Sequence, residues 1–217
     1  YLAAIRSRTD ALTQLINAFH EYSKVDHPQF TLQRRDLDLC EYLREYLAGQ
    51  YDAIELAGFA LEVSIPEEPC PCSLDPFQFG RALDNLMGNA LRHNRLGTLL
   101  TVPLAVEPGW ALLTVADNGE GIPPQRAAAI FEPFVVGSDA RSGGGSGLGL
   151  SITRRLVELH GGTITAESAD EHIVFTLRLP LAPAKAAALP DAAREAMLAA
   201  IPAGRPGTPE DVAAAVA

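Results

Sequence analysis

Apolar residues recur along the chain with two different periods, which predict helices in some segments and strands in others. Residues 2–23 contain two series of positions seven residues apart, the spacing of a coiled-coil stripe. The two series are Ile5, Leu12 and Phe19, and Leu2, Thr9 and Ile16. One helix cannot bury such a stripe alone. We therefore interpret the segment as one helix of a hairpin or dimer whose partner helix lies elsewhere.

The middle of the chain mixes helical periods with short alternating segments that are typical of strands. Asp38 with Glu41, and Asp75 with Gln78, have the spacing of helix-capping pairs, and Gly58 can end the first of these helices. We predict helices at 38–57, 75–94, 124–130 and 149–160. We predict strands, in a sheet expected to be antiparallel, at 59–65, 99–106, 110–117, 163–166 and 173–179. This pattern predicts an α+β fold with two layers.

Beyond Pro180 the composition changes, and residues 183–217 are dominated by alanine and proline. We place a boundary near Pro183 and expect one or two helices in this tail. Residues 201–213 resemble a segment near the C-terminus of short-chain dehydrogenases. The glycine-rich motif and the Tyr-x-x-x-Lys pair of that family are absent from the sequence, so we expect no dehydrogenase activity.

Charge and cysteine content narrow the functional classes. With 17 basic and 27 acidic side chains the net charge is −10, which disfavours nucleic acid and anionic lipid as partners. A small phosphate site built from backbone amides and one cation remains compatible with that charge. Three cysteines favour free thiols in a reducing compartment over a disulfide framework. No apolar run is long enough to span a bilayer, and no signal peptide opens the sequence, so we expect a cytoplasmic location.

Three polar residues recur at helical spacing within the predicted helix 75–94. Asn85 and Asn89 are four positions apart and Arg92 follows three later, so they share one face. A carboxamide oxygen suits Mg²⁺ that phosphates also hold, and arginine can offset phosphate charge. Asparagines at this spacing also occur on ordinary helix surfaces, so the pattern alone leaves both interpretations open.

Two glycine-containing segments carry further candidate chemistry. Asp117 ends a predicted strand, where a carboxylate can accept an amino proton from a base, and Gly119 and Gly121 let the backbone approach a flat ring. The same residues also form an ordinary Asn-Gly turn pattern. Residues 143–150, Gly-Gly-Gly-Ser-Gly-Leu-Gly-Leu, open a helix whose amides and dipole favour an anion. Their spacing matches neither a P-loop nor a Rossmann fingerprint.

The order and spacing of four segments resemble the N, G1, F and G2 boxes of the catalytic, ATP-binding domain of sensor histidine kinases. The segments are 83–94, 117–123, 130–134 and 143–150. The resemblance covers about 38–180 and extends to a superfamily that includes Hsp90, MutL and type II topoisomerase ATPase domains. It implies a two-layer α/β sandwich, the Bergerat-type ATP-binding fold, with a coiled-coil-like N-terminal helix. It divides the chain into a hairpin helix and linker, 1–35, a catalytic domain, 36–182, and a tail, 183–217.

The resemblance also implies roles for the asparagine helix. Asn89 would coordinate Mg²⁺ with Asn85 beside it, and Arg92 would contact phosphate. The ATPases of the superfamily have a glutamate where this chain has Asn85, and that glutamate activates water. Asparagine cannot act as a general base, so Asn85 favours phosphoryl transfer over hydrolysis.

The remaining motifs would hold the nucleotide. By resemblance, Asp117 would bind the adenine amino group in a pocket shaped by Gly119 and Gly121. Residues 132–146 would form the mobile ATP lid, anchored by Phe131 and Phe134. Backbone contacts to the phosphates would come from Gly145, Gly147, Leu148 and Gly149.

The implied function is that of a two-component protein-histidine kinase module that transfers the γ-phosphoryl group of Mg-ATP to a histidine on a phosphoacceptor helix. The one His-Glu pair, His20-Glu21, lies on the helix that resembles the second of the hairpin and lacks the proline of the acceptor motif. We therefore expect the acceptor to be absent from this chain, which should not autophosphorylate alone. The alternative is a non-catalytic fragment that binds only ATP or partners.

The implied partners are an acceptor hairpin, a response regulator and a second copy paired through the N-terminal helix. Such a chain would be free in the cytoplasm or the cytosolic portion of a membrane-anchored sensor. The sequence departs from the family at His172-Ile173, near a position that often has Gly-Thr beside the adenine pocket. Ile173 supplies no hydroxyl, so we expect reduced nucleotide affinity.

Overall fold

The computed structural model describes residues 2–119, 121–123, 126–127, 129–135, 146–169 and 172–183. The chain through Leu181 forms one compact unit. The helices predicted in the tail lie outside the described residues. The domain limits at 35 and 182 stay predictions.

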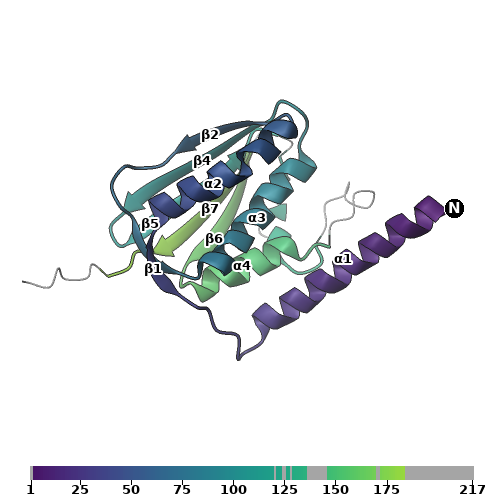
Figure 1. Ribbon diagram of the computed structural model, residues 1–217, viewed down its shortest axis with the longest axis horizontal. Helices are drawn as coiled ribbons and strands as arrows, with labels where there is room; N and C mark the ends of the chain where they lie inside the picture. The colour runs from purple at the N-terminus through teal and green to yellow at the C-terminus, as the bar shows by residue number, and fades with distance from the viewer. Residues whose placement is uncertain are drawn as a thin grey trace, which may run out of the picture. The chain divides into compact units, whose positions relative to one another are not determined.

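Five strands form one mixed sheet in the order β2-β4-β5-β7-β6 (Figure 1). They are β2 (Ala60–Ser64), β4 (Leu99–Glu107), β5 (Trp110–Asp117), β6 (Thr163–Ala169) and β7 (His172–Pro180). Three neighbouring pairs are antiparallel, but β2 runs parallel to β4. The prediction of an antiparallel sheet was wrong at this edge. The chain between β2 and β4 includes a whole helix, which is the kind of connection that parallel strands require.

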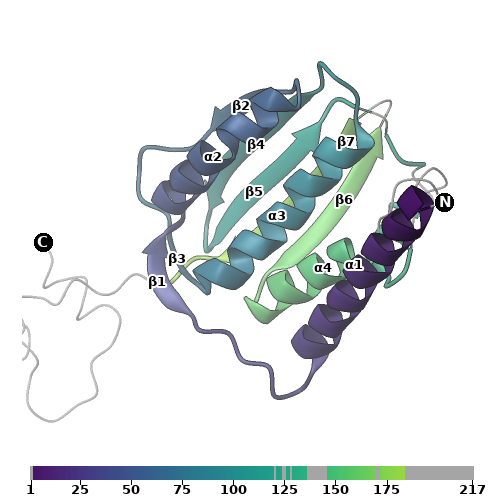
Figure 2. The same cartoon turned by 45° about the vertical axis from the view of Figure 1, so that its right-hand side comes forward.

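Three helices cover one face of this sheet (Figure 2), so the predicted two-layer α+β architecture is confirmed. They are α2 (Leu39–Leu56), α3 (Pro76–His93) and α4 (Gly149–Leu159). Along β5 the residues alternate between partly exposed and buried, as expected for a strand with one face against helices. The largest fully buried side chains, which close this core, include Phe79, Leu83, Leu100, Leu113 and Leu177.

A second, two-stranded antiparallel sheet was not predicted from the sequence. It consists of β1 (Arg35–Asp38) and β3 (Pro71–Leu74). The three cysteines, Cys40, Cys70 and Cys72, lie at or beside these strands and are buried free thiols, as predicted. The predicted helix at 124–130 is also corrected. In the described part of that segment the helical structure is of the 3₁₀ type, at Arg126 and at Ala129–Phe131.

The N-terminal helix α1 (Leu2–Asp26) packs against α4 through its C-terminal end. Val25 is buried there in a cluster with Leu148, Ile152 and Leu156. The members of the predicted stripe whose side chains are described lie on the other part of the helix and are exposed. Exposed large apolar side chains on α1 are Ile5, Leu12, Leu15, Ile16 and Phe19. No helix in the described part of the chain is long and apolar enough to cross a membrane.

Aspartates cap the two helices whose starts were predicted. The Asp38 carboxylate accepts from Cys40 N at 3.0 Å and from Cys70 N at 2.8 Å. The Asp75 carboxylate accepts from the amides of Phe77 and Gln78, both at 3.1 Å. It also accepts from Gln33 N at 2.8 Å, which fixes the linker after α1 to the start of α3. The cap therefore aligns the helix that carries the candidate asparagines.

His160, directly after α4, is fully buried and joins this cap to α4. Its Nε2 accepts from Asp75 N at 3.0 Å, and its Nδ1 lies 2.7 Å from Leu156 O. These contacts require a neutral ring with the proton on Nδ1. Burial lowers the pKa of His160, and the positive charge of Arg34 lowers it further, against the carbonyl of Leu156 and the carboxylate of Asp75.

His160 should make the free energy of unfolding depend on pH. The unfolded chain binds a proton below about pH 6.5, whereas the folded chain resists it. Above that pH, His160 should contribute fully to the free energy of unfolding. Below it, the free energy of unfolding should fall by up to about 1.4 kcal/mol per pH unit, until the pH reaches the lowered pKa of the folded chain.

Urea denaturation of His160→Phe from pH 8 to pH 5 measures this contribution. The variant should be less stable at pH 8, because the Asp75 amide loses its acceptor, but its curve should lack this one-proton slope. His20→Gln, at an exposed histidine on α1, is the control and should follow the wild-type curve. If the free energy of unfolding changed equally with pH in wild type and in His160→Phe, His160 would not be the cause of the pH dependence.

Candidate functional site

The predicted asparagine face lies on α3, and its first member ties α3 to α4. Asn85 Nδ2 donates to Gly149 O at 3.1 Å and is 3.3 Å from Thr153 Oγ1. A carboxamide that donates in this way leaves its oxygen for another group. Asn85 thus fixes the start of α4, where the predicted phosphate-binding glycines end, against the middle of α3.

One turn further along α3 are the two other predicted polar side chains, Asn89 and Arg92. Asn89 is partly buried, and its side chain makes no hydrogen bond within the residues that the structure describes. Arg92 is exposed and folds along its own helix, with Nε donating to Gly88 O at 3.1 Å. An amide oxygen and a guanidinium on adjacent turns form a donor set that suits a metal-phosphate group.

Asp117 lies at the end of β5 with only 5% of its surface exposed. Its Oδ1 accepts from Gly119 N at 3.1 Å, and the side chain of Asn94 also hydrogen-bonds its carboxylate. Burial raises the pKa of Asp117, while these two hydrogen bonds and the nearby His172 and His93 lower it. A buried carboxylate with these few partners is suited to receive the amino group of a base.

Gly119 must be glycine for a steric reason. A Cβ at this position would lie 1.6 Å from Asn94 Oδ1 and 2.2 Å from Asn94 Cγ. Gly121 belongs to the same loop, which is held to β6 because Ile122 N donates to Ser168 Oγ at 2.8 Å. The sequence predicted both glycines. Asn94 ends the predicted segment 83–94, but the sequence predicted no role for it.

Ile173, the predicted departure from the family, lies opposite Asp117 in the pairing of β7 with β5. On its other side it pairs with Ser168 of β6. The Ser168 hydroxyl donates to His172 O at 3.0 Å, so this hydroxyl is used within the protein. Reduced nucleotide affinity at this edge of the site stays a prediction.

The second glycine segment meets the predicted lid anchor. Gly147 has φ +67°, and a Cβ there would lie 2.8 Å from the carbonyl carbon of Phe134. Phe134 N donates to Gly147 O at 2.9 Å, and Leu148 N is 3.3 Å from Ser146 Oγ. Leu148 is fully buried at the start of α4. Gly145 and residues 136–145 of the predicted lid lie outside the described residues.

The two predicted anchor residues differ in their surroundings. Phe131 is buried and packs edge-on against Phe175, with ring centroids 6.3 Å apart. Phe134 is 54% exposed and has φ +65°, an uncommon conformation for a bulky residue. Phe131 therefore belongs to the core, and Phe134 stays available to a lid or a partner.

The structure brings the predicted segments together around α3. Asn85 joins α3 to the start of α4, and Asn94 joins its end to Asp117. The described residues contain no group of three histidine, cysteine or acidic side chains placed to hold a metal. A metal here would depend on carboxamide and phosphate oxygens. The half-buried side chain of Asn89, which has no hydrogen bond to any described residue, fits that requirement.

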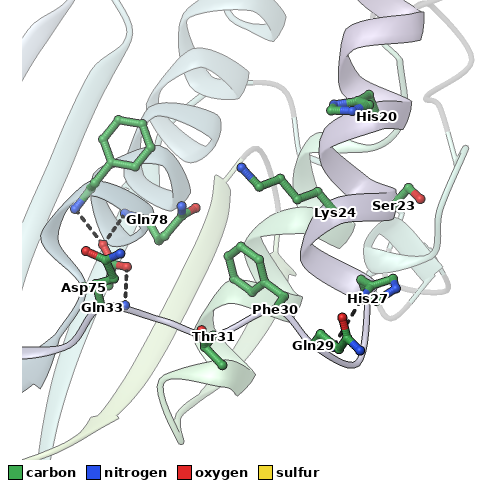
Figure 3. A pocket seen from close by; sticks show the side chains of 11 residues that line it. His20, Ser23, Lys24, His27, Gln29, Phe30, Thr31, Gln33, Asp75 and Gln78 are labelled. Atoms are coloured by element: carbon green, nitrogen blue, oxygen red, sulfur yellow. Dashed lines mark hydrogen bonds between the residues drawn. The ribbon is translucent and has the colours of Figure 1, made fainter.

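A cavity of about 880 Å³ lies elsewhere, between the end of α1, the following linker and the start of α3 (Figure 3). His20 and Lys24 of α1 line it, together with His27 and Phe30 of the linker and Gln78 of α3. None of the predicted nucleotide-site residues lines this cavity. It marks the junction of the N-terminal helix with α3 and is separate from the asparagine face.

Comparisons with known proteins agree with this arrangement. Residues 74–183 match the family described as histidine kinase-, DNA gyrase B-, and HSP90-like ATPase. The sensor histidine kinase YcbM of Bacillus subtilis (strain 168) is 30% identical over 181 residues, covering 82% of this chain and 58% of the relative. The chain thus spans little more than half of that relative's length.

Solved structures give the same result. The mycobacterial sensor histidine kinase MprB is 32% identical with a TM-score of 0.59, covering 69% of this chain and 99% of that one. Full-length ShkA in complex with AMPPNP is 27% identical with a TM-score of 0.67, covering 85% of this chain and 39% of that one. The chain therefore belongs to the histidine kinase-, DNA gyrase B-, and HSP90-like ATPase family, and it carries the catalytic ATP-binding module of a sensor histidine kinase.

Proposed function

We propose that this module binds Mg-ATP and transfers the γ-phosphoryl group to a histidine on an acceptor helix supplied by another chain or segment. Two features of one region carry the proposal. A buried, ionisable acceptor, Asp117, is hydrogen-bonded to Asn94 at the end of α3. In the last turns of the same helix, the amide of Asn89 has no hydrogen bond to any described residue. Asp117 would accept from the adenine amino group. Asn89 would hold Mg²⁺, which neutralises phosphate charge when bound.

The other residues of the site would position the phosphates. Arg92 lies one turn after Asn89 and can swing from its contact with Gly88 to a phosphate oxygen. The amides at the start of α4, from Gly147 to Gly149, would face the anion, where the helix dipole adds a favourable field. Gly145 would add a further contact. Catalysis would then consist mainly of alignment and charge stabilisation, as in other phosphoryl transfers.

The surroundings of Asn85 favour transfer over hydrolysis. In the transfer, the acceptor imidazole nitrogen forms a bond to the γ-phosphorus while the bond to the bridging oxygen breaks and ADP leaves. Hydrolysis would instead need a base beside the γ-phosphate to activate water. Asn85 is no base, and its amide nitrogen is committed to Gly149 O.

The exposed α1 stripe supports a homodimer in the full protein. Ile5, Leu12, Ile16 and Phe19 are each more than half exposed, and their heptad-like spacing suits a partner helix. We propose that this face pairs with the acceptor hairpin and with a second copy, and that a response regulator receives the phosphoryl group. Cytoplasmic ATP would then place this module on the cytoplasmic side.

Calorimetric titration with ATP, with and without Mg²⁺, followed by transfer to a separately supplied acceptor hairpin, tests the proposed function. We expect saturable binding that Mg²⁺ strengthens, and an acid-labile phosphohistidine on the hairpin. Binding without phosphohistidine would favour the alternative, a non-catalytic ATP-binding fragment. Absence of binding up to millimolar ATP would contradict the proposal, and steady release of free phosphate without acceptor would contradict the assignment of Asn85.

A further inference from the structure

Asn94 ends α3 and reaches two parts of the site at once. As the residue that caps the helix, it has φ −111° and ψ 167°, and its Nδ2 donates to Ala90 O at 3.0 Å. Its side chain also hydrogen-bonds the Asp117 carboxylate. A carboxamide nitrogen carries two hydrogens, so one can serve the helix end and the other the carboxylate.

The Asn94 amide also fills the space above Gly119. Its Oδ1 lies where a Cβ of residue 119 would be, 1.6 Å from that position. Gly119 N in turn donates to Asp117 Oδ1 at 3.1 Å. Asn94, Asp117 and Gly119 therefore form one interlocked cluster, in which each residue limits the conformation of the other two.

We propose that Asn94 is a positioning residue for nucleotide binding, which orients and stabilises the ionised Asp117 carboxylate and connects it to the helix that carries Asn89 and Arg92. This inference rests on the proposed function for the role of Asp117 toward adenine. It assigns a role to Asn94, the last residue of the segment 83–94, for which the sequence alone predicted none. Through Asn94, a shift of the end of α3 would change the orientation of the adenine acceptor.

The electrostatics of the cluster agree with this role. Burial raises the pKa of Asp117, and the hydrogen bonds from Gly119 and Asn94 oppose that rise. His93 at the end of α3 and His172 at the start of β7 act in the same direction as those bonds. Without the Asn94 donor the pKa of Asp117 should rise further. A protonated Asp117 no longer presents an ionised acceptor to an adenine amino group.

Two substitutions separate the donor from the shape of the side chain. Asn94→Asp keeps the shape over Gly119 but replaces the donor by a second carboxylate, while Asn94→Ala removes both. We expect ATP affinity at pH 7.5 to fall about 10-fold for Asn94→Ala and more for Asn94→Asp, because adjacent carboxylates raise one another's pKa. In wild type, ATP affinity should fall at acidic pH as Asp117 becomes protonated, and we call this fall the acidic limb of ATP binding. In the variants the acidic limb should move to higher pH, so the loss of affinity relative to wild type should increase toward pH 6.

The control is Asn118→Ala, at the next asparagine along the chain. Asn118 Oδ1 accepts from Leu99 N at 2.7 Å, so this variant also loses a local hydrogen bond. It should leave the acidic limb of ATP binding in place. If Asn94→Ala weakened binding equally at every pH, with the acidic limb unmoved, Asn94 would be a structural helix cap and the inference would be overturned.

A nucleotide-free measurement keeps this inference separate from the proposed function. Carbon-detected NMR titration of the Asp117 carboxyl in the free chain should give a higher pKa in Asn94→Ala than in wild type, by about one unit. An unchanged Asp117 pKa would overturn the inference even if ATP binds. A raised Asp117 pKa in a chain that binds no ATP would retain the positioning role and refute only the proposed function.

The double variant Asn94→Ala/Gly119→Ala tests the steric part of the cluster. Gly119→Ala alone should strongly lower the melting temperature, because its methyl group overlaps the Asn94 amide. Removing that amide opens the space, so the double variant should melt above Gly119→Ala. Strictly additive effects of the two substitutions would contradict the interlocked arrangement.

Discussion

Asp117→Asn should weaken ATP binding roughly 100-fold and leave the nucleotide-free chain at least as thermally stable as wild type. The loss of binding has a direct cause. The substituted asparagine would offer one amide oxygen in place of two carboxylate oxygens, and its NH₂ group would oppose the adenine amino group. The site would lose an acceptor and gain a donor where a donor must bind.

The stability part of this prediction follows from the direction of the pKa shift. Burial raises the pKa of Asp117 in the folded chain above its unfolded value, so the folded chain binds the proton more tightly. Stability should therefore rise as the pH falls through the raised pKa, and at neutral pH the ionised carboxylate should reduce it. Asparagine removes that charge, while its oxygen can still accept from Gly119 N.

Calorimetry and a thermal melt of the same sample test both parts. Asp84→Asn is the matched control, since Asp84 lies exposed on α3 and accepts from Tyr46 Oη at 2.8 Å and from Gln50 Nε2 at 3.3 Å. Its ATP affinity should equal that of wild type. If Asp117→Asn bound ATP as tightly as wild type, Asp117 would not be part of the ATP-binding site. If the melting temperature of Asp117→Asn fell markedly, the Asp117 carboxylate would serve mainly to stabilise the fold.

The parts of the fold that the sequence predicted well are those with local causes. Asp75 followed by Pro76 starts α3 because a side-chain acceptor and a residue without an amide hydrogen both suit a first turn. Helix α2 likewise ends just before Gly58, as predicted. These signals act within a few residues, so a reading along the chain can find them.

The parts that it missed depend on contacts between distant segments. Strands β1 and β3 have four residues each, too few to show a period, and they pair across more than thirty residues. The direction of β2 relative to β4 depends on the path of the chain through α3, which no local pattern encodes. In the site, Asn94 ends the predicted segment 83–94, but its contacts with Gly119 and Asp117 join residues more than twenty positions apart, so the sequence did not predict them.

Tertiary contacts also distinguish Asn85 from Asn89, which the sequence places on the same face of α3. Asn85 is engaged with Gly149 and Thr153, whereas Asn89 has no side-chain partner among the described residues. These two asparagines therefore differ in their contacts, although they share one helix face. Only the position of α4 distinguishes them, and that position follows from tertiary packing.

Asn89→Ala should lower the rate of phosphoryl transfer to a supplied acceptor hairpin by about 100- to 1000-fold, the typical effect of losing one preorganised electrostatic contact. Removing its amide leaves no unsatisfied partner among the described residues, so the melting temperature should change little. In calorimetry, Mg²⁺ should no longer strengthen ATP binding, while binding of metal-free ATP should persist. Asn17→Ala, at an exposed position on α1, is the control and should transfer normally.

Asn85→Ala provides the contrast that makes the prediction specific. This variant loses the bond from Asn85 to Gly149 O, which joins α3 to α4, so its melting temperature should fall as well as its transfer rate. If Asn89→Ala lost stability instead, or if it kept the effect of Mg²⁺ on ATP binding, Asn89 would be no metal ligand. The Asn85 oxygen, the other carboxamide acceptor on this face of α3, would then be the better candidate.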